Sequence, residues 1–169
     1  MPAPMFPANA HRFDPYRTFK FQVLIDGKPV AGLKKMGALK RKTEPVKWRT
    51  AGDPAHERIM PGGTSYEPIV LEQGLTQDPV FEAWANLVNN IEGDAAMSLK
   101  NFRKNIVVNV LNLQGQVALS YKVFRAWVSD YQAMPDLDAT SMTAVGIQTI
   151  TLQHEGWERD TAVSEPTET

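Results

Sequence analysis

Three histidines are the side chains best suited to acid–base or metal chemistry. They are His11, His56 and His154, and they lie in unrelated segments with no carboxylate at the spacing of a metal site. The chain has no cysteine, which excludes a thiolate nucleophile, a thiolate metal site and a disulfide framework. We therefore interpret each histidine as a surface or capping residue and predict no metal site.

The acidic side chains do not form a catalytic pair either. Glu67 and Glu72 lie five positions apart in a predicted strand, so their carboxylates point to opposite faces. Asp136 and Asp138 lie in a predicted loop that contains a proline, and in such a loop aspartate ordinarily forms a turn. The glycines of Pro61–Gly63 are not followed by the Lys-Ser/Thr of a phosphate-binding loop. We expect no enzyme activity, no catalytic residue and no cofactor.

Length and composition narrow the class of protein. The chain has 169 residues and a net charge of −1, which suits one domain and argues against a general nucleic-acid binder. No window approaches the ~18 apolar residues of a membrane span, and the first residues lack the apolar core of a signal peptide. The absence of cysteine fits assembly in a reducing cytosol.

The charges are segregated along the chain. Residues 33–50 carry seven basic side chains against Glu44, a net of +6, whereas residues 51–95 carry eight acidic side chains against Arg58, a net of −7. Two such segments could be separate solvated faces, or they could pair within one molecule or between copies.

The first half of the chain predicts strands around a long excursion. Residues 18–26 alternate apolar and polar side chains, as a half-buried strand does. Asp26-Gly27 predicts a hairpin turn, and residues 30–36 could form the returning strand. Residues 37–63 read as a long loop in which 46–49 could be a short strand, and the glycines of Pro61–Gly63 set the return into a strand at 66–74.

One helix is expected, over about residues 78–92. Asp78 can cap it, Pro79 suits its first position and Gly93 suits its exit. A single apolar stripe predicts its packing face. The stripe consists of Phe81, Trp84, Val88 and Ile91.

The last third reads as strands again. Residues 102–112 and 117–128 predict a hairpin, and a loop at 129–141 precedes a final strand at 142–156. The apolar phase of that strand shifts between Ile147 and Ile150, which predicts a bulge or strong twist there.

The fold class that follows is mainly β: a small antiparallel barrel or sandwich of about six to eight strands with one flanking helix. The expected organisation is an N-terminal extension at 1–17, one β domain at 18–157 and a polar tail at 158–169.

Three stretches together resemble a known family. They are DPYRTFKFQVLIDG, PGGTSYEPIVLEQGLTQDPVFEAW and the closing TLQHEGW, and the resemblance covers residues 13–159. The chain is similar to the inner tube proteins of contractile injection systems: the phage tail-tube family, its relatives in extracellular phage-tail-like particles and, more remotely, the type VI secretion tube.

The resemblance implies a structural protein that assembles with itself. In that family, hexameric rings join sheets edge to edge and stack into a hollow tube within a contractile sheath. It implies sheath, baseplate and tube-terminator proteins as partners and a cargo in the lumen. It also implies assembly in the bacterial cytoplasm, as part of a virion or of a particle that is released from the cell.

Carried onto this sequence, the loop that reaches neighbouring subunits and rings is residues 34–60. Its candidate contact residues are Lys34, Lys35, Lys40, Arg41, Lys42, Lys47, Trp48 and Arg49. The polar side chains that alternate with apolar ones in the late strands are candidates for lining the lumen. These are Asn105, Asn109, Ser120, Lys122, Thr149 and Thr151.

Two other functions stay open at this point. A baseplate-proximal tube initiator or a cap of the same machine would share the fold but form a single ring. A small-barrel module could instead bind single-stranded nucleic acid through Lys34 to Arg49, with Trp48 stacking on a base. The acidic segment that follows argues against this second alternative, and we expect no specific nucleic-acid recognition.

Overall fold

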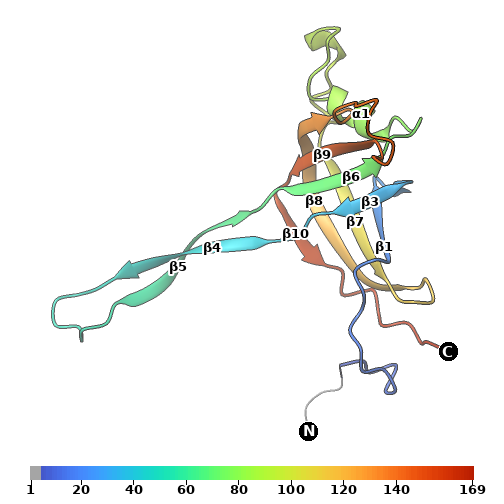
Figure 1. Ribbon diagram of the computed structural model, residues 1–169. Coiled ribbons are helices and arrows are strands. Elements are labelled where there is room, and N and C mark those ends of the chain that lie inside the picture. Colours follow the sequence, from blue (N-terminus) through green and yellow to red (C-terminus); the bar gives the residue numbers. More distant parts are fainter. Residues whose placement is uncertain (1–4) are drawn as a thin grey trace.

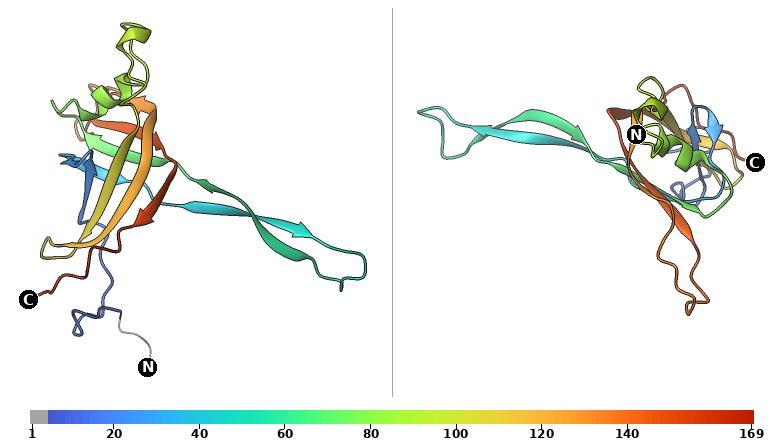
Figure 2. Two further views of the ribbon diagram at one scale, coloured as in Figure 1. Left: turned by 180° about the vertical axis from the view of Figure 1, so that it is seen from behind. Right: turned by 90° about the horizontal axis from the view of Figure 1, so that it is seen from above.

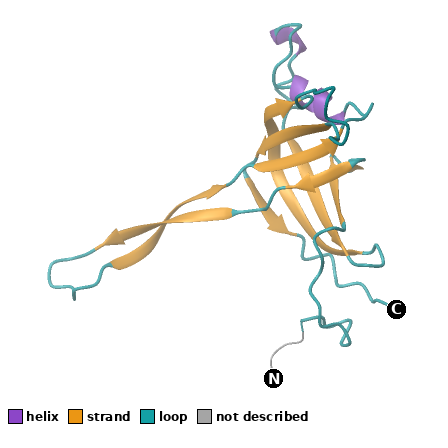
Figure 3. Ribbon diagram, in the orientation of Figure 1, coloured by secondary structure: helices purple, strands orange, loops and turns teal. Residues whose placement is uncertain are grey.

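Eight antiparallel strands curl into an open barrel from which a long two-stranded ribbon projects (Figure 1; Figure 3). The computed structural model describes residues 5–169. The order of the large sheet is β2-β1-β7-β8-β9-β6-β3, with β10 paired to β8. Its strands are β1 (Phe21–Ile25), β2 (Lys28–Pro29), β3 (Leu33–Met36), β6 (Ile69–Gly74), β7 (Lys104–Leu111), β8 (Val117–Gln132), β9 (Ile147–Gln153) and β10 (Gly156–Arg159). The mainly β fold predicted from the sequence is confirmed.

The turn predicted at Asp26-Gly27 is present, but the returning strand is not where it was expected. Both turn residues have positive φ, 51° and 78°, the requirement of a two-residue type I′ hairpin. β2 pairs with β1 at only two positions. The chain turns again at Gly32 (φ 67°), and β3 then pairs with β6 at the opposite edge of the sheet.

The hairpin of the last third is confirmed as β7 and β8, although β8 continues to Gln132 through part of the predicted loop. β8 can continue because β9 lies beside it and pairs Tyr131 with Ile150. The bulge predicted in the final strand is instead in β8, since Val128 and Asp130 face the consecutive residues Leu152 and Thr151.

A buried amide pair explains the apparent phase shift of the final strand. Gln148, Ile150 and Leu152 all point into the core, so the inward position at 148 is occupied by a polar residue. Gln148 Nε2 donates to Gln73 Oε1 at 2.7 Å, and Gln73 Nε2 donates to the carbonyl of Ala31. Burial is tolerated because these amide groups are hydrogen-bonded to one another and to the backbone.

The helix α1 (Val80–Asn86) is shorter than predicted. It begins one residue later than predicted, with Pro79 at the N-cap position and Val80 as the first helical residue. Asp78, one position before the cap, accepts a hydrogen bond from Val80 N–H at 3.2 Å. Phe81 and Trp84 are buried in the core, whereas Val88 lies beyond the helix and is half-buried. Ile91 is fully exposed, so the prediction that it packs on the core is wrong. The helix ends early because Ser98 N–H donates to Leu87 O and turns the chain back.

Gly93 does not follow the helix directly but precedes a short 3₁₀ turn, η1 (Asp94–Ala96). Among the described residues, no helix is long and apolar enough to cross a membrane.

The N-terminal extension, from residue 5, and the C-terminal tail lie at the end of the barrel opposite α1 (Figure 1). Asn9 is buried and donates to Glu165 Oε1 and to the carbonyl of Pro166, while its own Oδ1 accepts from Glu168 N–H. Arg12 forms an ion pair with Glu168 at 2.6 Å. The polar tail is therefore tied to the N-terminal extension by contacts between residues more than 150 positions apart.

Candidate functional site: a projecting ribbon and an open seam

The part of the chain that the structure describes contains no group of three or more His, Cys, Asp or Glu side chains that could hold a metal ion. His11 and His56 are exposed. His154 Nε2 donates to the carbonyl of Glu67 at 2.9 Å, and its Nδ1 is buried without a hydrogen-bond partner. Asp138 closes a turn by accepting from Thr140 N–H and Oγ1, and the Thr140 hydroxyl is the main reason that the pKa of Asp138 lies below its usual value.

The predicted long loop is a regular two-stranded ribbon. β4 (Arg41–Trp48) pairs with β5 (Arg58–Tyr66) from Arg41↔Tyr66 to Trp48↔Arg58. Figure 2 shows the ribbon reaching far from the barrel in both views. Every residue of β4 and nearly every residue of β5 is exposed. An isolated two-stranded hairpin is marginally stable in water, so this exposed ribbon needs further contacts to hold one shape.

The Pro61–Gly63 stretch is not a turn, which corrects the sequence prediction. It lies inside β5, where Gly62 and Gly63 together oppose Glu44 and form a bulge. A Cβ atom on Gly62 would lie 2.8 Å from Val46 Cγ2 and 2.9 Å from Glu44 O, so only glycine allows this approach of the two strands. Nothing lies within 4 Å of the equivalent position on Gly63.

One face of the distal half of the ribbon is apolar. Val46 lies opposite Met60, and two positions further along Trp48 lies opposite Arg58, so these four side chains share a face. Trp48 and Met60 are 39% and 43% exposed. Large apolar side chains with this much exposed surface add little to the stability of a single copy and are typical of an interaction surface. Arg58 covers part of Trp48, with its guanidinium 5.3 Å from the ring centroid.

The tip of the ribbon is fixed by Asp53. Its carboxylate accepts from Thr50 N–H at 2.9 Å, from Thr50 Oγ1 at 2.8 Å and from Arg58 at 3.0 Å. The Thr50 N–H, followed by the Thr50 hydroxyl, keeps the pKa of Asp53 below its usual value. These hydrogen bonds link Thr50, Asp53 and Arg58 within the tip.

The predicted contact residues are divided between two places. Lys34 and Lys35 lie in β3, within the barrel sheet, and not in the ribbon. Lys40 lies at the base of the ribbon, 3.7 Å from Glu67. The other five follow along or just beyond β4 and are all exposed. They are Arg41, Lys42, Lys47, Trp48 and Arg49.

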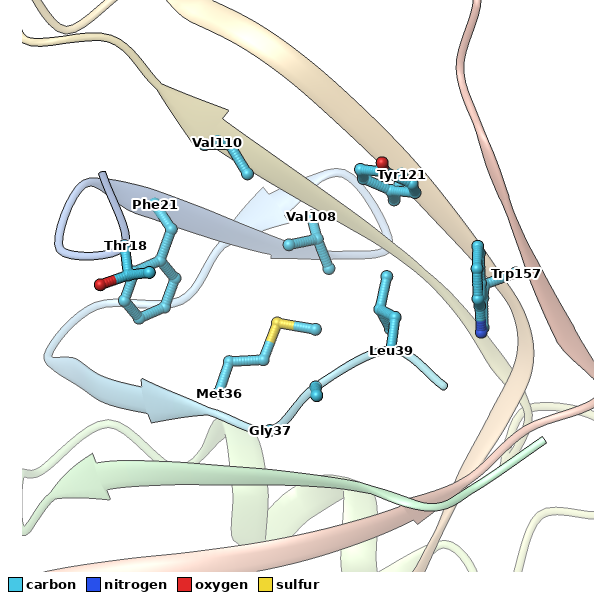
Figure 4. Close-up of a pocket in the computed structure, with 10 residues that line it drawn as sticks. Thr18, Phe21, Met36, Gly37, Leu39, Val108, Val110, Tyr121 and Trp157 are labelled. Carbon is cyan, nitrogen blue, oxygen red and sulfur yellow. The ribbon is translucent and has the colours of Figure 1, made fainter. Parts of the chain in front are cut away.

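An apolar cavity of about 410 Å³ opens between the two edges of the barrel sheet, a feature that sequence reasoning missed (Figure 4). Met36 and Leu39, at the end of β3 and beyond it, face Phe21 of β1 and Val108 of β7 across it. Tyr121 of β8 and Trp157 of β10 also line it. The lining is mostly apolar, and its side-chain hydroxyl groups are those of Thr18 and Tyr121.

All six lumen candidates lie on the outward face of the sheet, where they alternate with core residues of β7, β8 and β9, and Ser120 shares this face because it pairs with Asn109. Ser120 is only 3% exposed, so it is unsuited to lining a channel. The C-terminal segment lies next to Ser120, and Asp160 N–H in that segment donates to the Ser120 carbonyl at 2.8 Å.

A sequence model described as "T4-like virus tail tube protein gp19" matches residues 17–158. No curated protein matches the chain. The barrel is similar to a chain in the cryo-EM structure of the anti-feeding prophage tube-terminating cap, with a TM-score of 0.74, 23% identity, and 89% of this chain and 93% of that chain covered.

Two further solved structures are similar in the same way. One is a chain in the extended sheath-tube complex of the extracellular contractile injection system PVC (TM-score 0.70, 20% identity, 86% of this chain and 91% of that chain). The other is a chain in the anti-feeding prophage baseplate (TM-score 0.69, 20% identity, 88% of this chain and 97% of that chain).

Proposed function

Because the chain belongs to the T4-like virus tail tube protein family, we propose that it is a structural subunit of the inner tube of a contractile, phage-tail-like injection particle. Hexameric rings of the chain stack into a hollow tube that delivers a cargo. The family is one of structural tube proteins and not of enzymes.

The observation that carries the proposal is the exposed ribbon. A single copy leaves both faces of β4 and β5 uncovered. It also leaves two sheet edges, β2 and β3, with unpaired backbone groups. Pairing edges with identical neighbours around a closed rotation gives a ring, and contacts between unlike surfaces along the axis extend without closing. Further copies of the same chain would cover the faces of the ribbon and pair the free edges of the sheet.

The expected partners follow from this role. They are the sheath, the baseplate and a tube-terminator protein, with the cargo in the lumen. The outward residues Asn105, Asn109, Lys122, Thr149 and Thr151 are the candidates for the lumen wall. We expect assembly in the bacterial cytoplasm, within a virion or a particle that is later released.

A tube initiator or cap of the same machine is the second candidate. The similarity to chains from a baseplate and from a tube-terminating cap favours keeping it. Such a protein forms one ring, whereas a tube subunit forms many.

Electron microscopy of the purified chain separates these roles. A tube subunit is expected to form hollow tubes many rings long, because its axial contacts do not close. Single rings of uniform height would point to an initiator or a cap. A protein that stays monomeric at high concentration would contradict both.

A further inference from the structure

The ribbon is attached to the barrel by two short segments of chain. Residues 37–40 join β3 to β4, and Glu67 and Pro68 join β5 to β6. A two-stranded ribbon twists and bends readily because no third strand supports it. The direction in which the ribbon leaves the barrel therefore depends on what holds its first pair of residues.

Aromatic side chains of the barrel hold that first pair, which is Arg41↔Tyr66. Both of its side chains lie against Trp157 of β10. The Tyr66 ring is edge-on to the indole ring with centroids 6.4 Å apart, and the Arg41 guanidinium lies 6.0 Å from the indole centroid. Trp157 packs in turn on Tyr121 of β8, with centroids 6.0 Å apart, and both residues pack against the core (Figure 4). A row of rings therefore connects the core to the base of the ribbon.

The turn between β9 and β10 also contacts Tyr66. The His154 ring lies 5.8 Å from the Tyr66 ring, and His154 Nε2 donates to Glu67 O at 2.9 Å. At Gly156 an added Cβ atom would lie 3.3 Å from Tyr66 Cζ, so the ring lies directly on the glycine backbone. Tyr66 is half-buried, although the two residues before it are exposed. We call Tyr66, His154, Gly156 and Trp157 the base cluster.

The base cluster joins two of the stretches that carry the resemblance. Tyr66 belongs to PGGTSYEPIVLEQGLTQDPVFEAW, and the other three residues belong to TLQHEGW. The sequence pattern alone gives these residues no role. The structure brings them together at the point where the ribbon begins.

The stability of a single copy does not account for the choice of these rings. His154 Nδ1 and Trp157 Nε1 are buried without a hydrogen-bond partner within residues 5–169. A buried nitrogen without a partner lowers the stability of the folded chain, and an apolar side chain at either site would avoid that cost. The rings are better explained by the placement of the ribbon than by the stability of the barrel.

We propose that Tyr66, His154 and Trp157 are positioning residues that fix the direction of the ribbon before the chain assembles. The proposal rests on the proposed function, because identical subunits can repeat one contact only if their ribbons leave the barrels in the same direction. A direction that is set in advance also removes part of the ordering cost of association.

The direction of the ribbon can be measured in the dispersed chain. The chain has no cysteine, so Ala51→Cys at the tip and Lys28→Cys on β2 provide two exposed sites for spin labels. Double electron–electron resonance then gives the distribution of distances between the tip and the barrel. Tyr66→Ala is the test variant and Tyr66→Phe keeps the ring. Tyr131→Ala is the control, because it removes a tyrosine ring that packs on the core outside the base cluster.

Tyr66→Ala is expected to make the distance distribution at least about twice as wide, because the first pair of the ribbon then loses its ring contacts. Tyr66→Phe and Tyr131→Ala are expected to keep the wild-type width, and circular dichroism checks that each variant is folded. The proposal is overturned if Tyr66→Ala keeps the wild-type width. It is also overturned if Tyr131→Ala widens the distribution equally, because general destabilisation would then explain the effect.

Two glycine substitutions decide the question if Tyr66→Ala does not fold. Gly156 and Gly115 both have positive φ, 145° and 83°, so alanine strains the backbone at either site. The new Cβ atom meets the Tyr66 ring at Gly156, whereas nothing lies within 4 Å of it at Gly115. Gly156→Ala is expected to shift the mean distance and Gly115→Ala to leave it unchanged. Equal distributions from these two variants would contradict the positioning role.

Sedimentation of the unlabelled variants tests the consequence for assembly. Tyr66→Ala is expected to lower the assembled fraction at least about tenfold, and Tyr66→Phe to assemble like the wild type. Normal assembly of a Tyr66→Ala chain with a wide distance distribution would overturn the role of the preset direction in assembly. A wild-type chain that never assembles would instead refute the proposed function, while the resonance measurement on the dispersed chain would still decide whether the base cluster fixes the ribbon.

Discussion

Replacing Trp84 by alanine is expected to lower the free energy of unfolding by about 3–5 kcal/mol. The side chain is 1% exposed and fills the space between α1 and the sheet, so its removal leaves a cavity that the barrel cannot close. Its Nε1 also donates to the carbonyl of Phe102 at 2.8 Å, which ties the helix to the start of β7. Urea unfolding followed by far-ultraviolet circular dichroism, at low protein concentration, measures the change.

Trp48 supplies the matched control for this substitution. It is the same residue type, but it lies on the ribbon and is 39% exposed. Trp48→Ala is expected to stay within about 0.5 kcal/mol of the wild type. Equal losses from the two substitutions would show that the ribbon, and not only the barrel, belongs to the cooperative core.

Removing the ribbon is expected to abolish assembly while the barrel still folds. Glu67 N–H donates to Lys40 O at 3.2 Å, the geometry across the ends of a four-residue turn. Residues 41–66 can therefore be replaced by Asn-Gly, which favours a two-residue hairpin connection. No barrel strand loses a hydrogen-bonded partner, but the ring of Tyr66 no longer packs on Trp157 of β10. We therefore expect the free energy of unfolding to fall by about 1–2 kcal/mol, which leaves the barrel folded. Sedimentation and electron microscopy then report the loss of assembly.

A subtler pair of variants keeps the ribbon and changes only its shape. Gly62→Ala places a methyl group against Val46 and Glu44, whereas Gly63→Ala meets open space. The first substitution is expected to weaken assembly and the second to leave it unchanged, with equal barrel stability in both. Tubes of normal length from Gly62→Ala or from the ribbonless chain would contradict the role given to the ribbon.

The sequence predicted best those elements whose local pattern agrees with their surroundings. Alternation over residues 18–26 located β1, although the strand begins only at Phe21 and Phe19 is exposed. Asp26-Gly27 located its turn because both positions need positive φ. Phe81 and Trp84 were correctly predicted as the packing face of the helix. The resemblance, carried by three stretches, led to the family that the comparison supports.

The errors arose where a distant part of the chain decides the local structure. Gln148 is inward because Gln73, 75 positions away, receives its amide hydrogen bond. Ile91 is exposed because Ser98 turns the chain back after Leu87. Neither contact leaves a periodic signal in the sequence.

The ribbon was hidden for a different reason. Proline and glycine are rare inside strands, yet Pro45, Pro61 and Gly62 lie within β4 and β5. Because nearly every residue of the ribbon is exposed, β4 and β5 also lack the alternation of apolar and polar residues on which strand prediction depends.

Hydrogen–deuterium exchange over residues 41–66, measured in dispersed and assembled protein, tests most directly whether other copies cover the ribbon. In the dispersed chain these amides should exchange rapidly, while β7 and β8 serve as protected references in both states. We predict that assembly slows exchange across β4 and β5 by at least about tenfold. Equal exchange of the ribbon in dispersed and assembled protein would show that it is not the element through which the copies join.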